Sequence, residues 1–104
     1  MLERGALDRS VPPTGESFTD LLVRSHTRVV HIMSSATPDD GVYDQDEDEL
    51  AVVLQGSATL EVDGDTVELT AGDYLVLPAH TPHRVLRTDP GTEWLAIHVT
   101  TVMP

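Results

Sequence analysis

Short runs of apolar and β-branched residues, separated by turn sequences, fill the second half of this chain and constrain its fold most strongly. Asp63-Gly64-Asp65 predicts a tight hairpin between two such runs, and Asp89-Pro90-Gly91 separates the last two. Short strands at regular spacing indicate an all-β sandwich or barrel, and no segment has helical periodicity. The expected strands span residues 27–33, 50–54, 57–62, 66–70, 74–77, 83–87 and 93–102. Residues 18–22 fit either a short strand or a helical turn.

The 104 residues predict one domain, long enough to build a hydrophobic core without disulfides or metal staples. Residues 1–33 read as an N-terminal arm, irregular to about residue 17, followed by the first strand or strands of the barrel. Residues 34–104 read as the barrel core, beginning with a loop to residue 41. Because an arm strand can pair with the sheet edge of a second copy, we expect a homodimer.

The charge balance narrows the classes of partner. Eighteen acidic residues against six arginines and no lysine give a net charge of −12, which disfavours nucleic acids and anionic membranes. Without lysine or cysteine there is no side-chain Schiff base, disulfide or thiolate metal site. No apolar run reaches the roughly 18 residues of a membrane helix. Residues 1–10 lack the apolar core of a signal peptide, so a cytoplasmic location is expected.

Two histidines lie close to the end of a predicted strand. Pro78 cannot donate a hydrogen bond to a sheet ladder, so the strand is expected to end at Leu77. His80 then lies on the turn, and His83 begins the following strand. Upstream, Glu49 stands at the start of another strand. Imidazole and carboxylate groups at the rim of a β-structure can form a metal or substrate site.

These residues carry a resemblance to the cupin family. Glu49-x6-Gly56 resembles the end of the first cupin motif, and Gly72-x5-Pro78-x-His80-x2-His83 resembles the second, with His80 where a glycine is usual. The chain looks closest to small single-domain bacterial cupins of the type-2 conserved barrel family. The subgroup motifs are Tyr43-Asp44-Gln45…Glu49, Pro78-Ala79-His80…His83 and Trp94-Leu95-Ala96-Ile97-His98. This resemblance, over residues 43–98, implies a jelly-roll-like β-barrel, often dimeric, but leaves the activity open because cupins host many reactions.

The resemblance also implies a metal site, with one departure. In a metal-binding cupin a His-x-His pair, a glutamate and a later histidine converge inside the barrel. Glu49 and His83 match the last two positions, whereas Tyr43 and Gln45 replace both histidines of the pair. Gln45 offers a carbonyl oxygen, but a tyrosine is a poor ligand for a divalent metal unless it is ionised.

His98 could compensate for the missing pair. Side chains alternate along a strand, so Trp94, Ala96 and His98 share one face of the last strand, and which face looks into the barrel stays open. That strand is expected to run close to the strand of His83. If the His98 face is inward, a divalent transition metal (zinc, iron, manganese or nickel) could be held. The candidate ligands are then His83, Glu49, Gln45 and His98.

Each candidate also has an ordinary structural explanation. Both candidate histidines could be buried and hydrogen-bonded, and Glu49 could be a solvated carboxylate at the rim. Tyr43 and Gln45 could be surface or packing residues. His80 is expected to shape the turn or the pocket mouth, and Trp94 to fill the core or line a pocket. His26 and His31 are predicted to lie outside the site.

Two functions of different classes follow. The first is a metal-binding protein that acts on a small molecule by dioxygenation, isomerisation or cyclisation, with Glu49, His98 and Tyr43 as candidate catalytic residues. The second is a non-catalytic module that binds a small ligand at a degenerate metal site, which the loss of the His-x-His pair favours. A scaffold with a vestigial pocket is a third possibility. A DNA-binding regulator is disfavoured, because no helix-turn-helix is predicted.

Overall fold

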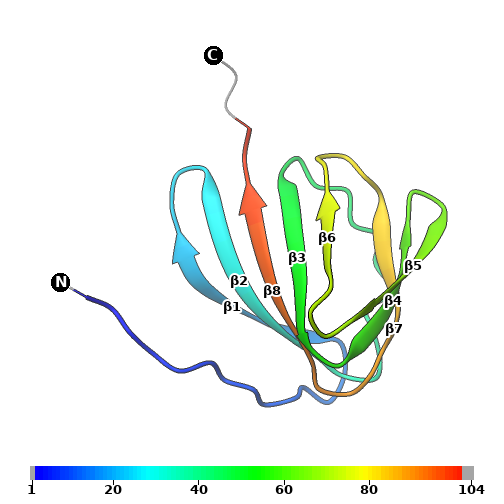
Figure 1. Cartoon of the computed structure of the whole chain (residues 1–104), viewed down its shortest axis with the longest axis horizontal. Coiled ribbons are helices and arrows are strands. Elements are labelled where there is room, and N and C mark those ends of the chain that lie inside the picture. The colour runs from blue at the N-terminus through cyan, green and yellow to red at the C-terminus, as the bar shows by residue number, and fades with distance from the viewer. Residues whose placement is uncertain (1, 102–104) are drawn as a thin grey trace.

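Eight antiparallel strands form two sheets that face each other across the molecule (Figure 1). The computed structural model describes residues 2–101, and no helix forms within them. The strands are β1 (Glu16–Val23), β2 (Thr27–Ser34), β3 (Asp48–Gln55), β4 (Ser57–Val62), β5 (Asp65–Thr70), β6 (Tyr74–Leu77), β7 (His83–Thr88) and β8 (Thr92–Val99). The all-β prediction is therefore confirmed. No helix long and apolar enough to span a membrane occurs among residues 2–101.

The larger sheet has the strand order β1-β2-β8-β3-β6, and the smaller has the order β5-β4-β7. β2 lies between β1 and β8, so residues 27–33 are an integral part of the barrel. The ambiguous segment at residues 18–22 belongs to the edge strand β1. Strands 57–62 and 74–77 have the predicted ends. The last strand ends at Val99, so its predicted extension over residues 100–101 is wrong, and the predicted last residue, Val102, lies outside the described residues.

One sequence-based expectation about strand neighbours is wrong. β8, which carries His98, pairs with β2 and β3, while β7, which carries His83, belongs to the other sheet. The two histidines therefore face each other across the barrel instead of lying on adjacent strands. This long-range choice of partners leaves no trace in local strand patterns.

The alternation of side chains gives the larger sheet one face toward the core and one toward the outside. The core cluster between the sheets is apolar and consists of Ala51, Val53, Ala58, Leu60, Leu69 and Trp94. On the outer face one cross-strand row runs over all five strands and is apolar throughout. Its members, taken as successive partners, are Leu22, Val29, Ile97, Leu50 and Val76.

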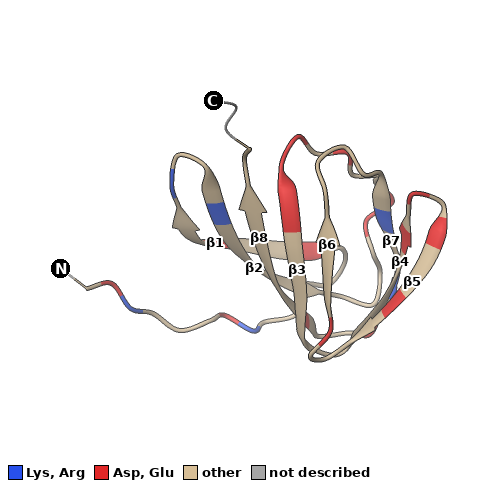
Figure 2. Cartoon of the chain, turned by 45° about the horizontal axis from the view of Figure 1, so that its top comes forward, with Lys and Arg blue, Asp and Glu red and all other residues tan. Residues whose placement is uncertain are grey.

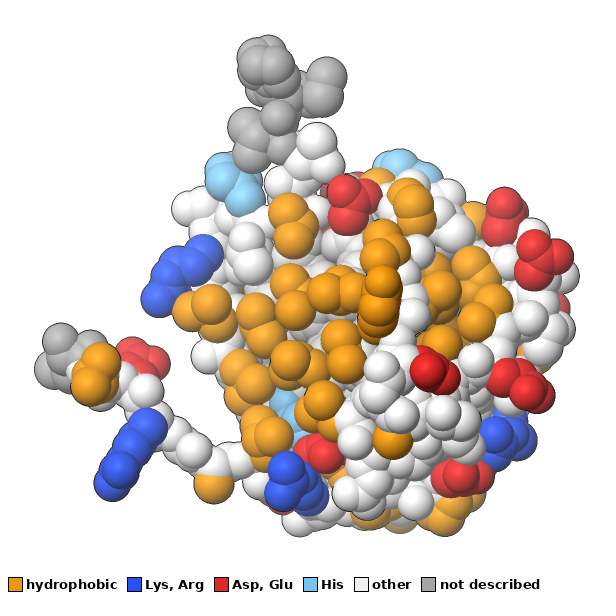
Figure 3. Space-filling view, viewed as in Figure 1, with side chains coloured by type: hydrophobic (Ala, Val, Ile, Leu, Met, Phe, Trp, Pro, Cys, Tyr) orange, Lys and Arg blue, Asp and Glu red, His pale blue; other side chains and the backbone are white. Residues whose placement is uncertain are grey.

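Hydrophobic side chains gather over this outer face in the space-filling view (Figure 3). Val76 is 58% exposed and its neighbour on β6, Tyr74, is 66% exposed. The outer face of the smaller sheet is polar by contrast, with Glu61 of β4 paired to Arg84 of β7. Acidic residues instead gather in the loop before β3 and at the start of that strand (Figure 2).

The irregular N-terminal arm is fastened to the outer face by a buried carboxylate. Glu93 of β8 is 3% exposed, and its Oε2 accepts a hydrogen bond from Arg9 Nε at 2.8 Å. His31 Nε2 of β2 lies 2.7 Å from the same oxygen. Burial alone would raise the pKa of Glu93, but these hydrogen bonds and charges outweigh it and hold the pKa below its ordinary value.

The turn between β3 and β4 brings the two sheets close together. Gly56 has a φ of +85°, and a Cβ there would lie 2.5 Å from Thr92 Oγ1 and 2.8 Å from Thr92 Cα. Two features of this turn therefore require glycine at position 56, namely the left-handed backbone and the close approach of β8.

Candidate functional site

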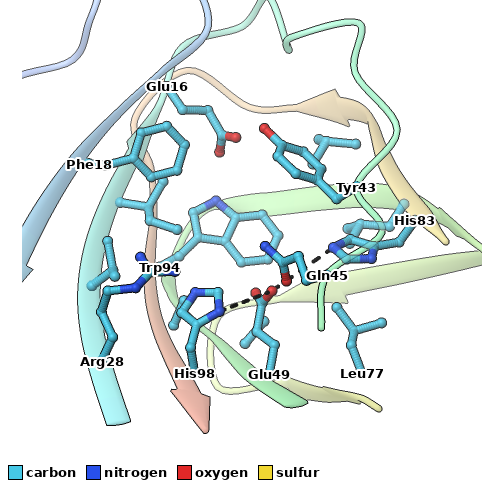
Figure 4. Close-up of a pocket in the computed structure, with 16 residues that line it drawn as sticks. Glu16, Phe18, Arg28, Tyr43, Gln45, Glu49, Leu77, His83, Trp94 and His98 are labelled. Carbon is cyan, nitrogen blue, oxygen red and sulfur yellow. Dashed lines mark ion pairs between the residues drawn. The ribbon is translucent and has the colours of Figure 1, made fainter. Parts of the chain in front are cut away.

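A cavity of about 120 Å³ lies between the sheets and is lined by residues from both of them (Figure 4). Its walls are largely apolar and include Phe18, Val30, Ile32, Leu60, Val85 and Trp94. Six of the seven sequence-predicted site residues line it, namely Trp94, Tyr43, Gln45, Glu49, His83 and His98. The open question about β8 is answered, because Trp94, Ala96 and His98 all face this cavity.

His83 is held with one ring nitrogen directed at the cavity. Its side chain is 8% exposed, and Nδ1 lies 2.9 Å from the carbonyl oxygen of Thr81. A carbonyl only accepts, so Nδ1 donates this hydrogen bond and Nε2 is the ring nitrogen left for other partners. The Tyr43 ring stacks on the imidazole with centroids 5.6 Å apart, and a backbone bridge joins the two residues. Nε2 is thus presented as an acceptor or a metal ligand.

Glu49 and His98 complete the polar end of the cavity. Glu49 Oε1 lies 4.0 Å from His83 Nε2 and 4.0 Å from His98 Nδ1, as the dashed lines in Figure 4 mark. These separations are too long for hydrogen bonds. His98 Nδ1 also lies 3.6 Å from Glu47 Oε1, and it is a buried atom without a hydrogen-bond partner among the described residues. Glu49 is no solvated rim carboxylate, since its side chain is 11% exposed.

The donor atoms are of the types that bind a divalent transition metal, although they lie too far apart to coordinate one ion. Two imidazole nitrogens, a carboxylate oxygen and the amide of Gln45 are ligands that zinc or iron(II) accepts. Within residues 2–101 no three His, Asp or Glu side chains are arranged so that they could hold a metal ion. Ligands that share a metal at about 2.1 Å stand roughly 3.0–3.4 Å apart, so each imidazole would have to approach Glu49 by about 0.6–1.0 Å.

The phenol of Tyr43 faces the same cavity but is poorly suited to ligate a metal. Burial raises its pKa further above the ordinary value of 10.0, and the negative charges of Glu16, Asp39 and Glu49 add to this. The phenol therefore stays protonated near neutral pH. It can offer a hydrogen bond to a bound molecule, which is the role that a neutral tyrosine performs best.

His80 is the sequence-predicted candidate that the structure places outside this cavity. Its ring is 69% exposed, and Nδ1 lies 3.0 Å from Asp44 Oδ1. Its φ of +61° lies in the left-handed region, which agrees with a turn position where glycine would be usual. Trp94 has both of its predicted roles, since it is 4% exposed in the core and also lines the cavity.

Sequence reasoning missed two polar residues that line the cavity, Glu16 and Arg28, and also Ser34, which hydrogen-bonds to Glu16. Glu16 accepts a hydrogen bond from Ser34 Oγ at 2.6 Å. Arg28 Nη2 lies 3.3 Å from Glu47 Oε1 and is paired with it. Had β1 been predicted from residue 16, the alternation that places Phe18 inward would also have placed Glu16 inward.

Comparison with known proteins now places the chain in a family. Residues 29–98 match the model of the cupin domain. This chain belongs to the cupin family. No curated protein sequence matches this cupin. A Ralstonia eutropha JMP134 protein of solved structure, named provisionally as a mannose-6-phosphate isomerase, is similar at 38% identity and a TM-score of 0.82, with 96% of this chain and 100% of that chain covered.

More distant solved structures show that the cupin fold is shared. A cupin superfamily protein of Desulfitobacterium hafniense DCB-2 is 18% identical with a TM-score of 0.82, covering 97% of this cupin and 94% of that chain. Salicylate 1,2-dioxygenase of Pseudoaminobacter salicylatoxidans is 16% identical with a TM-score of 0.74 over 86% of this cupin and 26% of the enzyme. At these identities the likeness concerns the fold, and the site has to be judged on its own residues.

Proposed function

We propose that this cupin acts on a small molecule at a divalent transition metal held by His83, Glu49 and His98, with Gln45 as a further oxygen ligand. The observation that carries the proposal is the buried, unpartnered Nδ1 of His98, which faces the same Glu49 oxygen as His83 Nε2. A buried polar atom without a partner costs about 1–3 kcal/mol. A cation between the two imidazoles and Glu49 would satisfy all three groups.

The charge of the cavity supports a cation. Glu16 and Glu49 both line the cavity, and Arg28, the one arginine among the described lining residues, is already paired with Glu47. Burial is the main cause of the raised pKa of both Glu16 and Tyr43, and the negative charge of Glu49 adds to it. A divalent metal would relieve this repulsion.

The reaction classes that fit are dioxygenation, isomerisation and cyclisation. A bound metal would polarise a carbonyl group or activate water or dioxygen. The apolar walls would exclude bulk water, the Tyr43 hydroxyl would hydrogen-bond the substrate, and Glu49 or His98 would hold or move a proton. The similar Ralstonia protein, provisionally named as an isomerase, is consistent with this range, and nothing in the cavity separates the classes.

Elemental analysis of the tag-free protein tests the proposal. We expect about one zinc, iron, manganese, nickel or copper per chain, lost in His83→Ala and retained in His26→Ala, which removes an exposed histidine. Circular dichroism of both variants checks that the barrel still folds. Absence of metal after reconstitution of the wild-type protein, or equal metal content in the two variants, would contradict the proposal.

A metal-free module that binds a small ligand is the second candidate function. It is favoured by the open arrangement of the site, in which no three His, Asp or Glu side chains of residues 2–101 could hold a metal as they lie. The replacement of the His-x-His pair by Tyr43 and Gln45 points the same way. Ligand binding that survives treatment with a chelator would favour this function over the first.

A second copy of the chain is the protein partner that we propose. The unbroken apolar row from Leu22 to Val76 covers all five strands of the larger sheet and faces outward. An apolar row of this kind can pair with its own copy about a twofold axis, in spite of the net charge of −12. The outer face of the smaller sheet, which carries Glu61 and Arg84, has no such row.

A further inference from the structure

A chain of hydrogen bonds fixes Glu16 at the edge of the cavity. Trp94 Nε1 lies 3.0 Å from Ser34 Oγ, and Ser34 Oγ lies 2.6 Å from Glu16 Oε2. The indole nitrogen can only donate, so Ser34 must accept there and give its own hydrogen to Glu16. Oε2 of Glu16 is thereby occupied as an acceptor, and Oε1 is the oxygen left for a ligand.

Glu16 stands at the end of the cavity opposite to the proposed metal site. Figure 4 shows Glu16 and the Tyr43 hydroxyl on one side of the Trp94 ring, and Glu49 and His98 on the other. The cavity thus has two polar ends separated by an apolar wall. A ligand that binds at Glu49 and fills the cavity would bring its far end to Glu16.

We propose that Glu16 is a second polar anchor, which binds a hydroxyl group at the far end of the ligand and excludes phosphate and carboxylate groups from that end. The inference rests on the proposed small-molecule function of the same cavity. It names the ligand class as one with an uncharged, hydroxyl-bearing end.

The charges around Glu16 give the physical reason. A phosphate needs a free basic group, but Arg28 is paired with Glu47, and the two lining histidines, His83 and His98, lie at the opposite end of the cavity. Burial raises the pKa of Glu16, the Ser34 hydrogen bond lowers it, and the charges of Asp39 and Glu49 raise it again. A hydroxyl group fits either protonation state, because it donates to the carboxylate and accepts from the carboxylic acid.

Two probes that differ only at their far ends test the inference. 4-(Hydroxymethyl)benzoate and terephthalate share one carboxylate for the metal end, and Trp94, the single tryptophan, reports their binding by its fluorescence. In the metal-reconstituted protein we expect the hydroxymethyl probe to bind at least about tenfold more tightly. Glu16→Gln should remove most of this preference, and Glu68→Gln, the same change at an exposed site on β5, should keep it.

The outcomes separate this inference from the proposed function. Equal affinities of the two probes, no measurable binding of either, or an unchanged preference in Glu16→Gln would overturn the role of Glu16. The metal content of each protein is measured in parallel. A wild-type protein that retains metal but lacks the preference contradicts only this inference, whereas a protein that cannot be loaded contradicts the proposed metal site.

Discussion

At the scale of single residues, Glu93 is a carboxylate whose burial is tolerated because of its partners. Its folded pKa lies below the ordinary 4.5. The associated stability is therefore present above pH 4.5 and is lost as the pH falls through the folded pKa. Because Glu93 also binds Arg9, it links the stability of the barrel in acid to the attachment of the N-terminal arm.

Glu93→Gln is expected to lower the free energy of unfolding at pH 7 by about 2–4 kcal/mol, because His31 and Arg9 lose a buried charged partner. The difference between wild type and variant should shrink as the pH falls below 4.5. Urea unfolding at pH 7 and at several acidic values measures both effects. Glu61→Gln, which breaks the exposed pair with Arg84, is the control and should cost less than about 1 kcal/mol. Equal losses in the two variants would contradict the role of burial.

The sequence predicts the metal end of the cavity better than the opposite end. Motif spacing identifies Glu49 and His83, and strand alternation groups His98 with Trp94, although it cannot tell which face is inward. The sequence does not predict Glu16 as a cavity residue, because it precedes the segment that could be read as a strand. A single glutamate in an irregular arm gives no signal of its own. Its role depends on Ser34 and Trp94, whose pairing requires the folded sheet.

At the scale of elements, two glycine turns have similar backbone angles but different surroundings. Gly56 and Gly64 have φ values of +85° and +87°, but a Cβ at Gly56 would meet Thr92, whereas nothing lies within 4 Å of one at Gly64. In both alanine variants the left-handed backbone is expected to lower the free energy of unfolding by about 1 kcal/mol. Gly56→Ala also introduces a clash, so we expect its free energy of unfolding to fall by about 2–4 kcal/mol.

Chemical denaturation of Gly56→Ala and Gly64→Ala measures that difference directly. The excess loss in Gly56→Ala is the energetic effect of the close approach between the β3–β4 turn and β8. Equal losses would mean that backbone conformation alone requires glycine at position 56. Crystal structures of the two variants would show whether β8 has shifted at Thr92.

Turn residues account for most of what the sequence predicts about the elements. Glycine turns delimit both ends of β4 and the start of β6, because each turn needs a backbone that other residues rarely adopt, and Pro78 marks the end of β6. Strand order is another matter. The neighbours of β8 are chosen by packing between residues more than 35 positions apart, such as Glu49 and His98, and no local pattern records that choice.

At the scale of the whole molecule, the outer face of the larger sheet determines the expected assembly. The wild-type protein should be a dimer in solution, and Val76→Lys should make it monomeric by placing a charge in the apolar row. Val76 is 58% exposed in the single chain, so the fold itself should survive. Light scattering coupled to size exclusion measures the mass.

Thr66→Lys is the matched control, because it places the same charge on an exposed position of β5 in the smaller sheet. It should remain dimeric. A monomeric wild-type protein, or dissociation of both variants, would contradict pairing through the larger sheet.

The cavity has one further consequence, which concerns how its natural ligand can be found. Its walls come from two separate sheets, with Glu49 and His98 on one and His83 and Val85 on the other. A molecule bound between them contacts both sheets and therefore stabilises the folded barrel. At a free concentration one hundred times its Kd, a ligand adds about 2.7 kcal/mol to the free energy of unfolding. The melting temperature, measured in the presence of each member of a library of metabolites, should therefore rise with the true ligand. No assay of its chemistry is required.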